Sequence, residues 1–131
     1  MPALNYKKEF APLVEIGLKE PDNPLGKRQT IRAYRKDGRD PKPGDTLYHY
    51  TGIRTKACRK LGESECIGVV DLGISKSGVC FLVYDDSKAE LIDGGALEQF
   101  ARADGFDGVE SFFEFFETTH NLPFYGNVIY W

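Results

Sequence analysis

The sequence predicts an α+β protein in which a small mixed β-barrel carries flanking helices. Short stretches of β-branched and aromatic residues recur at even spacing through the middle of the chain. Two helical patterns follow one another late in the chain, and no stretch alternates strand and helix as βαβ units do. This order disfavours a parallel, doubly wound sheet. At 131 residues the chain has the length of one domain, which we expect to span 1–131.

The first part of the chain predicts one helix and two strands. Within residues 7–19, apolar side chains recur at the i, i+3, i+4, i+7 spacing of one helix face. The segment 20–26 is rich in Pro and Gly and is expected to end this helix in a loop. Residues 29–34 and 46–52 contain β-formers and are expected as strands, and 36–45 has the composition of a long turn.

A β-hairpin is predicted in the middle of the chain. Residues 65–75 and 78–85 have the composition of strands, and a Lys-Ser-Gly turn joins them. The cation-rich segment 53–64 before the hairpin is expected as a connection, and 88–93 as a further short strand.

Two helices and a strand close the chain. Residues 95–106 carry apolar side chains on one side and end near a glycine, which predicts a helix. Residues 107–120 begin with an aspartate cap and carry four phenylalanines, which predicts a second helix with an aromatic face. The aromatic stretch 126–131 is expected as a strand that pairs with an early strand, because such a sequence is poorly tolerated at a loose end.

The net charge of −3 conceals a strong segregation of charge. Residues 26–60 contain eleven Lys or Arg and three Asp, a net charge of +8, and the rest of the chain nets −11. A positive lobe of this kind attracts anions, and we expect it to border a hollow that holds a nucleobase. The alternative is that folding brings acidic side chains close enough to pair with these cations.

Cysteine and histidine usage predicts neither a disulfide framework nor a metal site. Cys58, Cys66 and Cys80 include no Cys-x-x-Cys pair, and neither histidine lies at a ligand spacing from a cysteine pair. We expect free thiols and no cofactor. No apolar run approaches the roughly 18–20 residues of a membrane span, and the first residues lack a secretory signal pattern. A cytoplasmic protein without a membrane partner is expected, and its oligomeric state is left open.

The stretch GKRQTIR at 26–32 is a candidate catalytic centre. Desolvation and a neighbouring Arg28 or Arg32 would lower the pKa of Lys27, which could then take a proton from Thr30. Thr30 would be the nucleophile, and a carboxylic acid that the local sequence does not identify would supply a proton to the leaving atom. In the alternative interpretation the cations bind phosphate or water and Thr30 is an ordinary strand residue.

A second constellation, at 50–60, suggests a nucleic-acid contact. Its cations offer phosphate contacts, and two tyrosines offer stacking surfaces for bases. The tyrosines would otherwise alternate between core and surface as in any strand, and no glycine-rich phosphate cradle is present. The residues predicted to contact nucleic acid are Arg28, Arg32, Tyr48, Tyr50, Arg54, Thr55, Lys56 and Arg59.

Taken together, five stretches of the chain resemble the ASCH domain family of the PUA-like superfamily, particularly its compact phage and bacterial members. The resemblance extends over 8–131 and rests on GKRQTIR, KPGDTLYHYTG, RTKACRKLG, ADGFDGVESFFEFF and VIYW. It implies a β-barrel with flanking helices and a cleft that handles RNA, nucleosides or modified bases.

One branch of that family removes the acetyl group from N4-acetylcytidine with a Lys, a Thr three residues later and a downstream Glu. By resemblance, Lys27 is the base, Thr30 the nucleophile and Arg32 an arginine that follows them. Asp104 falls at the position of the Glu and is one methylene shorter. The chain also contains the segment 54–66, which the compact amidohydrolases lack. Other ASCH proteins are single-strand ribonucleases or binding proteins.

The sequence therefore leads to a ranked set of functions. We expect a PUA-like module that binds RNA or modified nucleotides or nucleosides through a basic cleft. The first alternative is an amidohydrolase on N4-acetylcytidine-type substrates with Lys27, Thr30 and Asp104 as catalytic residues, and another is a single-strand ribonuclease. A further alternative is a protein-interaction domain that docks through the aromatic helix at 107–120.

Overall fold

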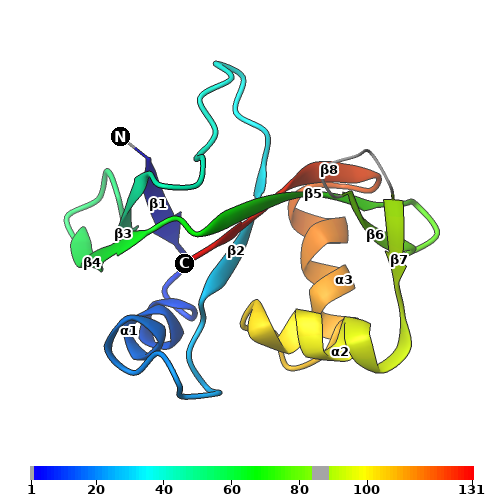
Figure 1. Ribbon diagram of the computed structural model, residues 1–131, viewed down its shortest axis with the longest axis horizontal. Helices are drawn as coiled ribbons and strands as arrows, with labels where there is room; N and C mark the ends of the chain where they lie inside the picture. Colours follow the sequence, from blue (N-terminus) through cyan, green and yellow to red (C-terminus); the bar gives the residue numbers. More distant parts are fainter. Residues whose placement is uncertain (1, 84–88) are drawn as a thin grey trace.

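The structure is a computed structural model that describes residues 2–83 and 89–131 (Figure 1). It is an α+β fold, as the sequence predicts, and the described residues form two sheets and three helices. The elements in chain order are β1 (Ala3–Tyr6), α1 (Ala11–Lys19), β2 (Gln29–Ala33), β3 (Thr46–Thr51), β4 (Arg59–Glu65), β5 (Gly68–Ile74), β6 (Cys80–Val83), β7 (Ala89–Ile92), α2 (Gly94–Ala103), α3 (Val109–Thr119) and β8 (Phe124–Tyr130).

The larger sheet has the strand order β2-β8-β5-β6-β7 and is antiparallel throughout. The final strand β8 lies between β2 and β5, which confirms the predicted pairing with an early strand, and the β5–β6 hairpin is also confirmed. The smaller sheet has the order β1-β3-β4, with β1 parallel to β3. Among the described residues these two sheets are separate, and no closed barrel is found.

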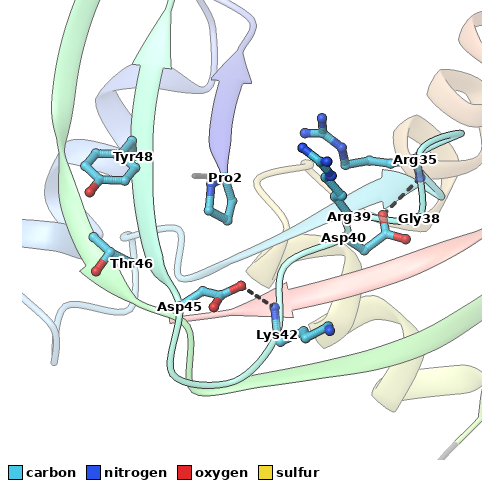
Figure 2. A pocket seen from close by; sticks show the side chains of 9 residues that line it. All are labelled: Pro2, Arg35, Gly38, Arg39, Asp40, Lys42, Asp45, Thr46 and Tyr48. Carbon is cyan, nitrogen blue, oxygen red and sulfur yellow. Dashed lines mark hydrogen bonds between the residues drawn. The ribbon is translucent and has the colours of Figure 1, made fainter.

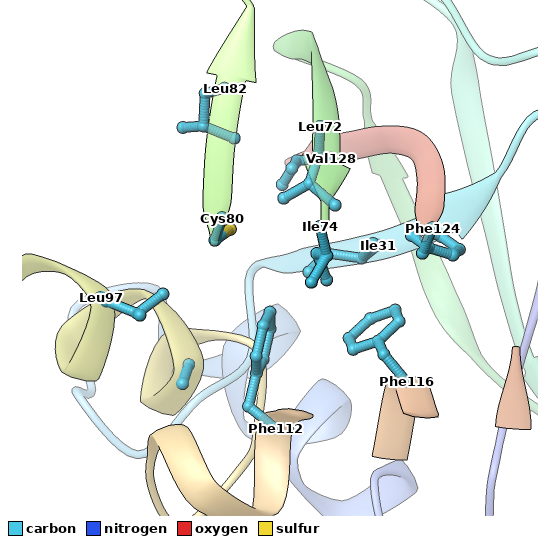
Figure 3. Packing of buried hydrophobic residues seen from close by; sticks show 11 residues of the cluster. Ile31, Leu72, Ile74, Cys80, Leu82, Leu97, Phe112, Phe116, Phe124 and Val128 are labelled. Carbon is cyan, nitrogen blue, oxygen red and sulfur yellow. The ribbon is translucent and has the colours of Figure 1, made fainter. Parts of the chain in front are cut away.

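Helices cover each sheet on one side, as Figure 1 shows. The larger core lies between the five-stranded sheet and helices α2 and α3 (Figure 3). Phe112 and Phe116, one helical turn apart on α3, are fully buried in this core, and their rings pack 5.0 Å apart. The other two phenylalanines of α3, Phe113 and Phe115, are only half-buried. The aromatic helix face is therefore mostly a core face.

A second, smaller core joins α1 to the three-stranded sheet and to the end of the chain. Its buried residues are Leu4, Tyr6, Val14, Leu47, Cys66, Ile129 and Trp131. The Trp131 amide donates to the carbonyl of Arg28 at 3.1 Å, and the Ile67 amide donates to the carbonyl of Tyr130 at 2.9 Å. These contacts hold the last residues of the chain where the two sheets meet.

Several element predictions need correction. The predicted helix at 7–19 begins only at Ala11, and the chain before it includes the unpredicted strand β1. The segment 53–64, expected as a connection, contains most of the unpredicted strand β4, which is polar and largely exposed because it is an edge strand. The helix predicted from 107 begins at Val109.

The predicted strands 78–85 and 88–93 are present as β6 and β7, although their facing ends lie outside the described residues. Helix α2 ends at Ala103, before the predicted end of the helix at 95–106. None of the helices in the described part of the chain is long and apolar enough to cross a bilayer.

Candidate active site

A hollow of about 270 Å³ lies beside β2, between the β1–α1 segment and helix α3. Lys27, Thr30, Arg32 and Asp104 all line it, although Asp104 is far from the other three in sequence. Lys27, Thr30 and Asp104 are each less than 5% exposed. We refer to this hollow and its lining residues as the candidate active site.

Lys27 is held in place by a close approach between helix α1 and the segment that leads into β2. The Lys27 amide donates to the carbonyl of Leu13 at 2.8 Å. A Cβ on Gly17 would lie 2.1 Å from the Lys27 carbonyl oxygen, and a Cβ on Gly26 would lie 2.7 Å from the Cα of Gly17. Only residues without a side chain allow these backbones to meet, so the two glycines fix the depth at which Lys27 enters the hollow.

Asp104 comes from the end of α2, where its amide donates to the carbonyl of Phe100 at 3.1 Å. Its Oδ1 atom is 3.2 Å from the Lys27 ammonium, and Lys27 also donates to the main-chain carbonyl of Asp104. Oδ1 is buried and accepts no well-aligned hydrogen bond from the residues that the structure describes. The carboxyl group therefore has an ion-pair partner and an acceptor position that no described residue fills.

Burial dominates the ionisation of this pair. Desolvation lowers the pKa of Lys27 well below its usual value, against the raising effect of the Asp104 carboxylate. Desolvation likewise raises the pKa of Asp104, against the lowering effect of the Lys27 ammonium. Both shifts favour the uncharged forms, so a neutral amine can face a protonated carboxyl group. These are the protonation states that a general base and a general acid need.

Thr30 and Arg32 are two residues apart on β2 and therefore point to the same face of the strand. The Arg32 Nε–H donates to Thr30 Oγ1 at 3.1 Å. A cationic donor at this oxygen stabilises negative charge that forms on it, which makes the hydroxyl a better nucleophile.

Tyr6 contacts the Arg32 guanidinium group and is itself held by hydrogen bonds that run through His49 to Ser64. The Arg32 guanidinium carbon lies 4.8 Å from the centroid of the Tyr6 ring, a cation–π distance. The Tyr6 hydroxyl bonds to His49 Nδ1 at 2.9 Å, and His49 Nε2 bonds to the Ser64 hydroxyl at 2.7 Å. Burial lowers the pKa of His49 to about 4, so this imidazole is neutral near pH 7.

Aromatic rings form the other walls of the hollow. Phe10, Phe106 and Phe115 pack edge to face or tilted against one another, with centroid separations of 5.3 to 6.3 Å. The Lys27 amine lies 5.3 Å from the Phe10 centroid. Flat apolar walls beside a few polar groups suit a planar heteroaromatic ring, because the walls can stack on the ring and the polar groups can bind its substituents.

The other residues predicted from 26–60 lie elsewhere. Arg28 donates through Nε and Nη2 to the Trp131 carbonyl at 3.1 and 2.9 Å, so it holds the chain end and does not face the hollow. Thr55 Oγ1 is engaged in a turn, where it donates to the Gly52 carbonyl at 2.6 Å. Arg59 makes two hydrogen bonds to Glu15.

The remaining predicted contacts belong to β3 and the turn after it. Tyr48 and Tyr50 are half-buried on β3, and Arg54 and Lys56 are exposed in the β3–β4 turn. None of these four lines the candidate active site. Among the described residues, the alternative that the cations of 26–60 pair with acidic side chains holds for four of the eleven. Lys27 pairs with Asp104, Arg35 with Asp37, Arg59 with Glu15 and Lys60 with Glu63.

Sequence reasoning missed Tyr6, His49 and the aromatic walls. Tyr6 lies on a strand that was not predicted. The strand pattern around His49 does not indicate that Tyr6 would hydrogen-bond to it, because the two residues are distant in sequence. Phe106 and Phe115 follow the Asp104 position closely in sequence, which was the available signal that an aromatic wall accompanies the acid.

In the described ranges, no group of three or more His, Cys, Asp or Glu side chains is arranged to hold a metal ion. Comparison with protein-family models, curated proteins and solved structures finds no match to this chain.

Proposed function

We propose that the protein is an amidohydrolase that removes the acyl group from the exocyclic amine of an N4-acylated cytosine. The observation that carries the proposal is that the buried Lys27–Asp104 pair and the buried Thr30 line one hollow with aromatic walls. One branch of the ASCH family of PUA-like barrels, which the sequence resembles, carries out this reaction. The shorter Asp104 side chain reaches to within 3.2 Å of the Lys27 amine.

The first half of the reaction would form an ester on Thr30. Lys27 takes the hydroxyl proton as Thr30 Oγ1 bonds to the acyl carbonyl carbon. The bond between that carbon and the exocyclic nitrogen breaks, and Asp104 gives the nitrogen its proton, so that cytosine leaves with a free amine. Arg32 donates to Oγ1 and stabilises the negative charge that the departing proton leaves on this oxygen before the new bond is complete.

The second half would return each group to its starting state. A water molecule adds to the ester carbon, and the Asp104 carboxylate takes a proton from that water. Lys27 returns its proton to Thr30 Oγ1 as the carboxylic acid leaves. The sum is one amide and one water converted to one amine and one carboxylic acid, and no other reactant is needed.

The test is incubation of the purified protein with N4-acetylcytidine, followed by chromatographic detection of cytidine and acetate. Thr30→Ala is expected to lower the rate at least ~100-fold, as loss of a nucleophile does, and Thr30→Ser to restore part of it. Thr118→Ala, which removes an exposed threonine hydroxyl from α3, is the matched control and is expected to leave the rate unchanged. No turnover by the wild type, or equal turnover by Thr30→Ala, would overturn the proposal.

A second candidate is binding of RNA or modified nucleotides without hydrolysis, which the charge segregation favours. In that case the same hollow would hold an unpaired base, and the cations would contact phosphates. Single-strand ribonuclease activity is tested in parallel with an end-labelled single-stranded RNA. Shortened products that persist in the Thr30→Ala variant would favour the ribonuclease over the deacylase.

A further inference from the structure

A second hollow lies next to the candidate active site. It is an open groove of about 550 Å³ that lies between strand β3 with Pro2 and the loop 34–45, which connects β2 to β3. Figure 2 shows Arg35 and Arg39 extending from the loop into this groove, with Pro2 and Tyr48 on the opposite side. Lys42 also lines it. We refer to this hollow as the loop groove; its volume is about twice that of the candidate active site.

A smaller hollow of about 190 Å³ borders both of them. It shares Arg32 and Ala33 with the candidate active site, and it shares Pro2, Arg35 and Asp40 with the loop groove. The three hollows therefore follow one another along β2 and into the loop. We refer to these three neighbouring hollows as the track.

The track is positive in a molecule whose net charge is negative. Six cationic side chains and three carboxyl groups line the three hollows, a formal charge of +3, whereas the whole chain carries −3. Two further hollows lie around α3, beyond the wall formed by Phe10, Phe106 and Phe115. Carboxylates and no Lys or Arg line those two hollows; the carboxylates are Glu9, Glu98, Asp107, Glu110 and Glu114. An anionic ligand is therefore attracted to the track and repelled from the other side.

The two aspartates of the loop that line the groove accept hydrogen bonds from main-chain amides of the same loop. Asp40 accepts a hydrogen bond from the Arg35 amide at 3.0 Å, and Asp45 accepts one from the Lys42 amide at 2.9 Å, as Figure 2 shows. In the part of the chain that the structure describes, neither Arg39 nor Lys42 forms a side-chain ion pair. Their charges therefore remain available to an anion.

We propose that the loop groove binds the phosphate groups that flank the acylated base, so that the substrate is a nucleic-acid strand and not a free nucleoside. This inference rests on the proposed function. Arg32 and Arg35 line the smaller hollow, where they would meet a phosphate next to the bound nucleoside, and Arg39 and Lys42 line the loop groove, where they would meet further phosphates.

The first experiment measures binding without catalysis. The probe is a fluorescent oligocytidylate without acyl groups, and its anisotropy is followed at several salt concentrations. The double variant Arg39→Gln/Lys42→Gln is expected to bind at least about tenfold more weakly than the wild type. The slope of log K against log [salt] is expected to be smaller in magnitude by about 1–2, because fewer counterions are released when two phosphate contacts are missing. Lys19→Gln/Lys76→Gln removes the same charge from exposed positions outside the track and is expected to match the wild type.

The second experiment compares substrates. The ratio of kcat/KM for an acetylated oligoribonucleotide to kcat/KM for N4-acetylcytidine is measured in each protein, with N4-acetylcytidine 5′-monophosphate as a third substrate. The wild type is expected to favour the oligoribonucleotide over both small substrates, and the Arg39/Lys42 variant to lose about tenfold of that preference. The control variant is expected to retain the preference.

The two proposals fail in distinguishable ways. Hydrolysis of N4-acetylcytidine without any effect of the Arg39/Lys42 variant on oligonucleotide binding overturns the loop groove and leaves the deacylase intact. The loop groove is also overturned if the wild type has its highest kcat/KM with the free nucleoside, or if its kcat/KM for the monophosphate equals that for the oligoribonucleotide. Salt-dependent binding that requires Arg39 and Lys42, without hydrolysis of any substrate, supports the groove and overturns the deacylase.

Discussion

At the scale of single residues, Lys27 and Asp104 form an ion pair and are also the proposed general base and general acid. A charged pair could not fill the second role, because the base must be unprotonated and the acid protonated. Each is buried, and burial moves the two pKa values in opposite directions toward the uncharged forms. The pair thus carries one proton that either group can hold, and it titrates as a unit. A surface pair of the same residues would stay charged near pH 7 and could not exchange the proton with a substrate.

This pairing predicts a bell-shaped dependence of kcat/KM on pH. At low pH both groups are protonated and Lys27 is no longer a base; at high pH both are deprotonated and Asp104 is no longer an acid. The lowered pKa of Lys27 moves the acidic limb to lower pH, and the raised pKa of Asp104 moves the alkaline limb to higher pH, so the active range widens. Asp104→Asn is expected to lower kcat about 100-fold or more and to remove the alkaline limb. An unchanged alkaline limb in this variant would assign that limb to another group.

Tyr6 is expected to act as a positioning residue through Arg32. Its ring lies under the guanidinium group that donates to Thr30, and its hydroxyl is bonded to His49. Tyr6→Leu removes the ring and should lower kcat about tenfold, with a smaller change in KM, because Arg32 is less firmly held at Thr30.

Tyr6→Phe is the matched control, because it keeps the ring and removes only the hydroxyl. It should retain most of the catalytic rate and lose stability through the orphaned His49 nitrogen. Equal losses of kcat in Tyr6→Leu and Tyr6→Phe would show that the hydroxyl, not the ring, matters for catalysis.

At the scale of elements, β2 and the segment before it carry most of the candidate active site. Thr30 and Arg32 occupy one face of β2, while Ile31 between them points into the larger core. Pairing with β8 fixes this register, with Thr30 opposite Ile129 and Arg32 opposite Asn127. A shift by one residue would send both polar side chains into the core, so the apolar core and the catalytic geometry specify the same register.

The approach of α1 to this segment gives a stability prediction. Gly17→Ala places a methyl group 2.1 Å from the Lys27 carbonyl oxygen, a backbone atom that cannot move without displacing Lys27. It should lower the free energy of unfolding by about 1–3 kcal/mol and also lower activity. Gly95→Ala adds a methyl group to α2 in open space, and it should raise the free energy of unfolding by up to about 1 kcal/mol. Urea unfolding of both variants measures the difference, and equal effects would contradict this account.

At the scale of the whole molecule, the two sheets meet around His49 and Trp131. His49 on β3 is fully buried, and its ring centroid is 4.5 Å from that of Trp131 at the end of the chain. Tyr6 and Ser64 hydrogen-bond to its two nitrogens, and the Arg32 charge acts with burial to lower its pKa. The neutral imidazole thus belongs to the contact between the sheets.

This arrangement predicts a loss of stability in mild acid. The pKa of His49 is about 4 in the folded protein and 6.5 in the unfolded chain, so the unfolded chain binds more protons between these values. The free energy of unfolding should therefore fall by about 2–3 kcal/mol as the pH drops from 6.5 to 4, beyond the change due to other groups. His49→Gln can keep both hydrogen bonds and does not titrate. Denaturant unfolding at both pH values should show this extra loss in the wild type alone, and a parallel loss in the variant would exclude His49 as its source.

Much of the fold follows from local sequence patterns. The larger core, the β5–β6 hairpin and the two late helices arise from apolar periodicity and turn residues, which act between near neighbours. Strands β1 and β4 escape such reasoning, because β1 is four residues long and β4 is polar; both are strands because β3 supplies hydrogen bonds on its two sides.

The sequence by itself determined the residue types of the site: a lysine, a threonine and an arginine at fixed spacing, and an excess of positive charge in 26–60. Only the tertiary structure decided which of these charges act together. It brings Asp104 to Lys27, turns Arg28 and Arg59 to structural contacts, and leaves Arg39 and Lys42 lining a groove. The physical reason is that strand pairing and helix packing determine which distant side chains meet, and desolvation changes a pKa only after those side chains are buried together.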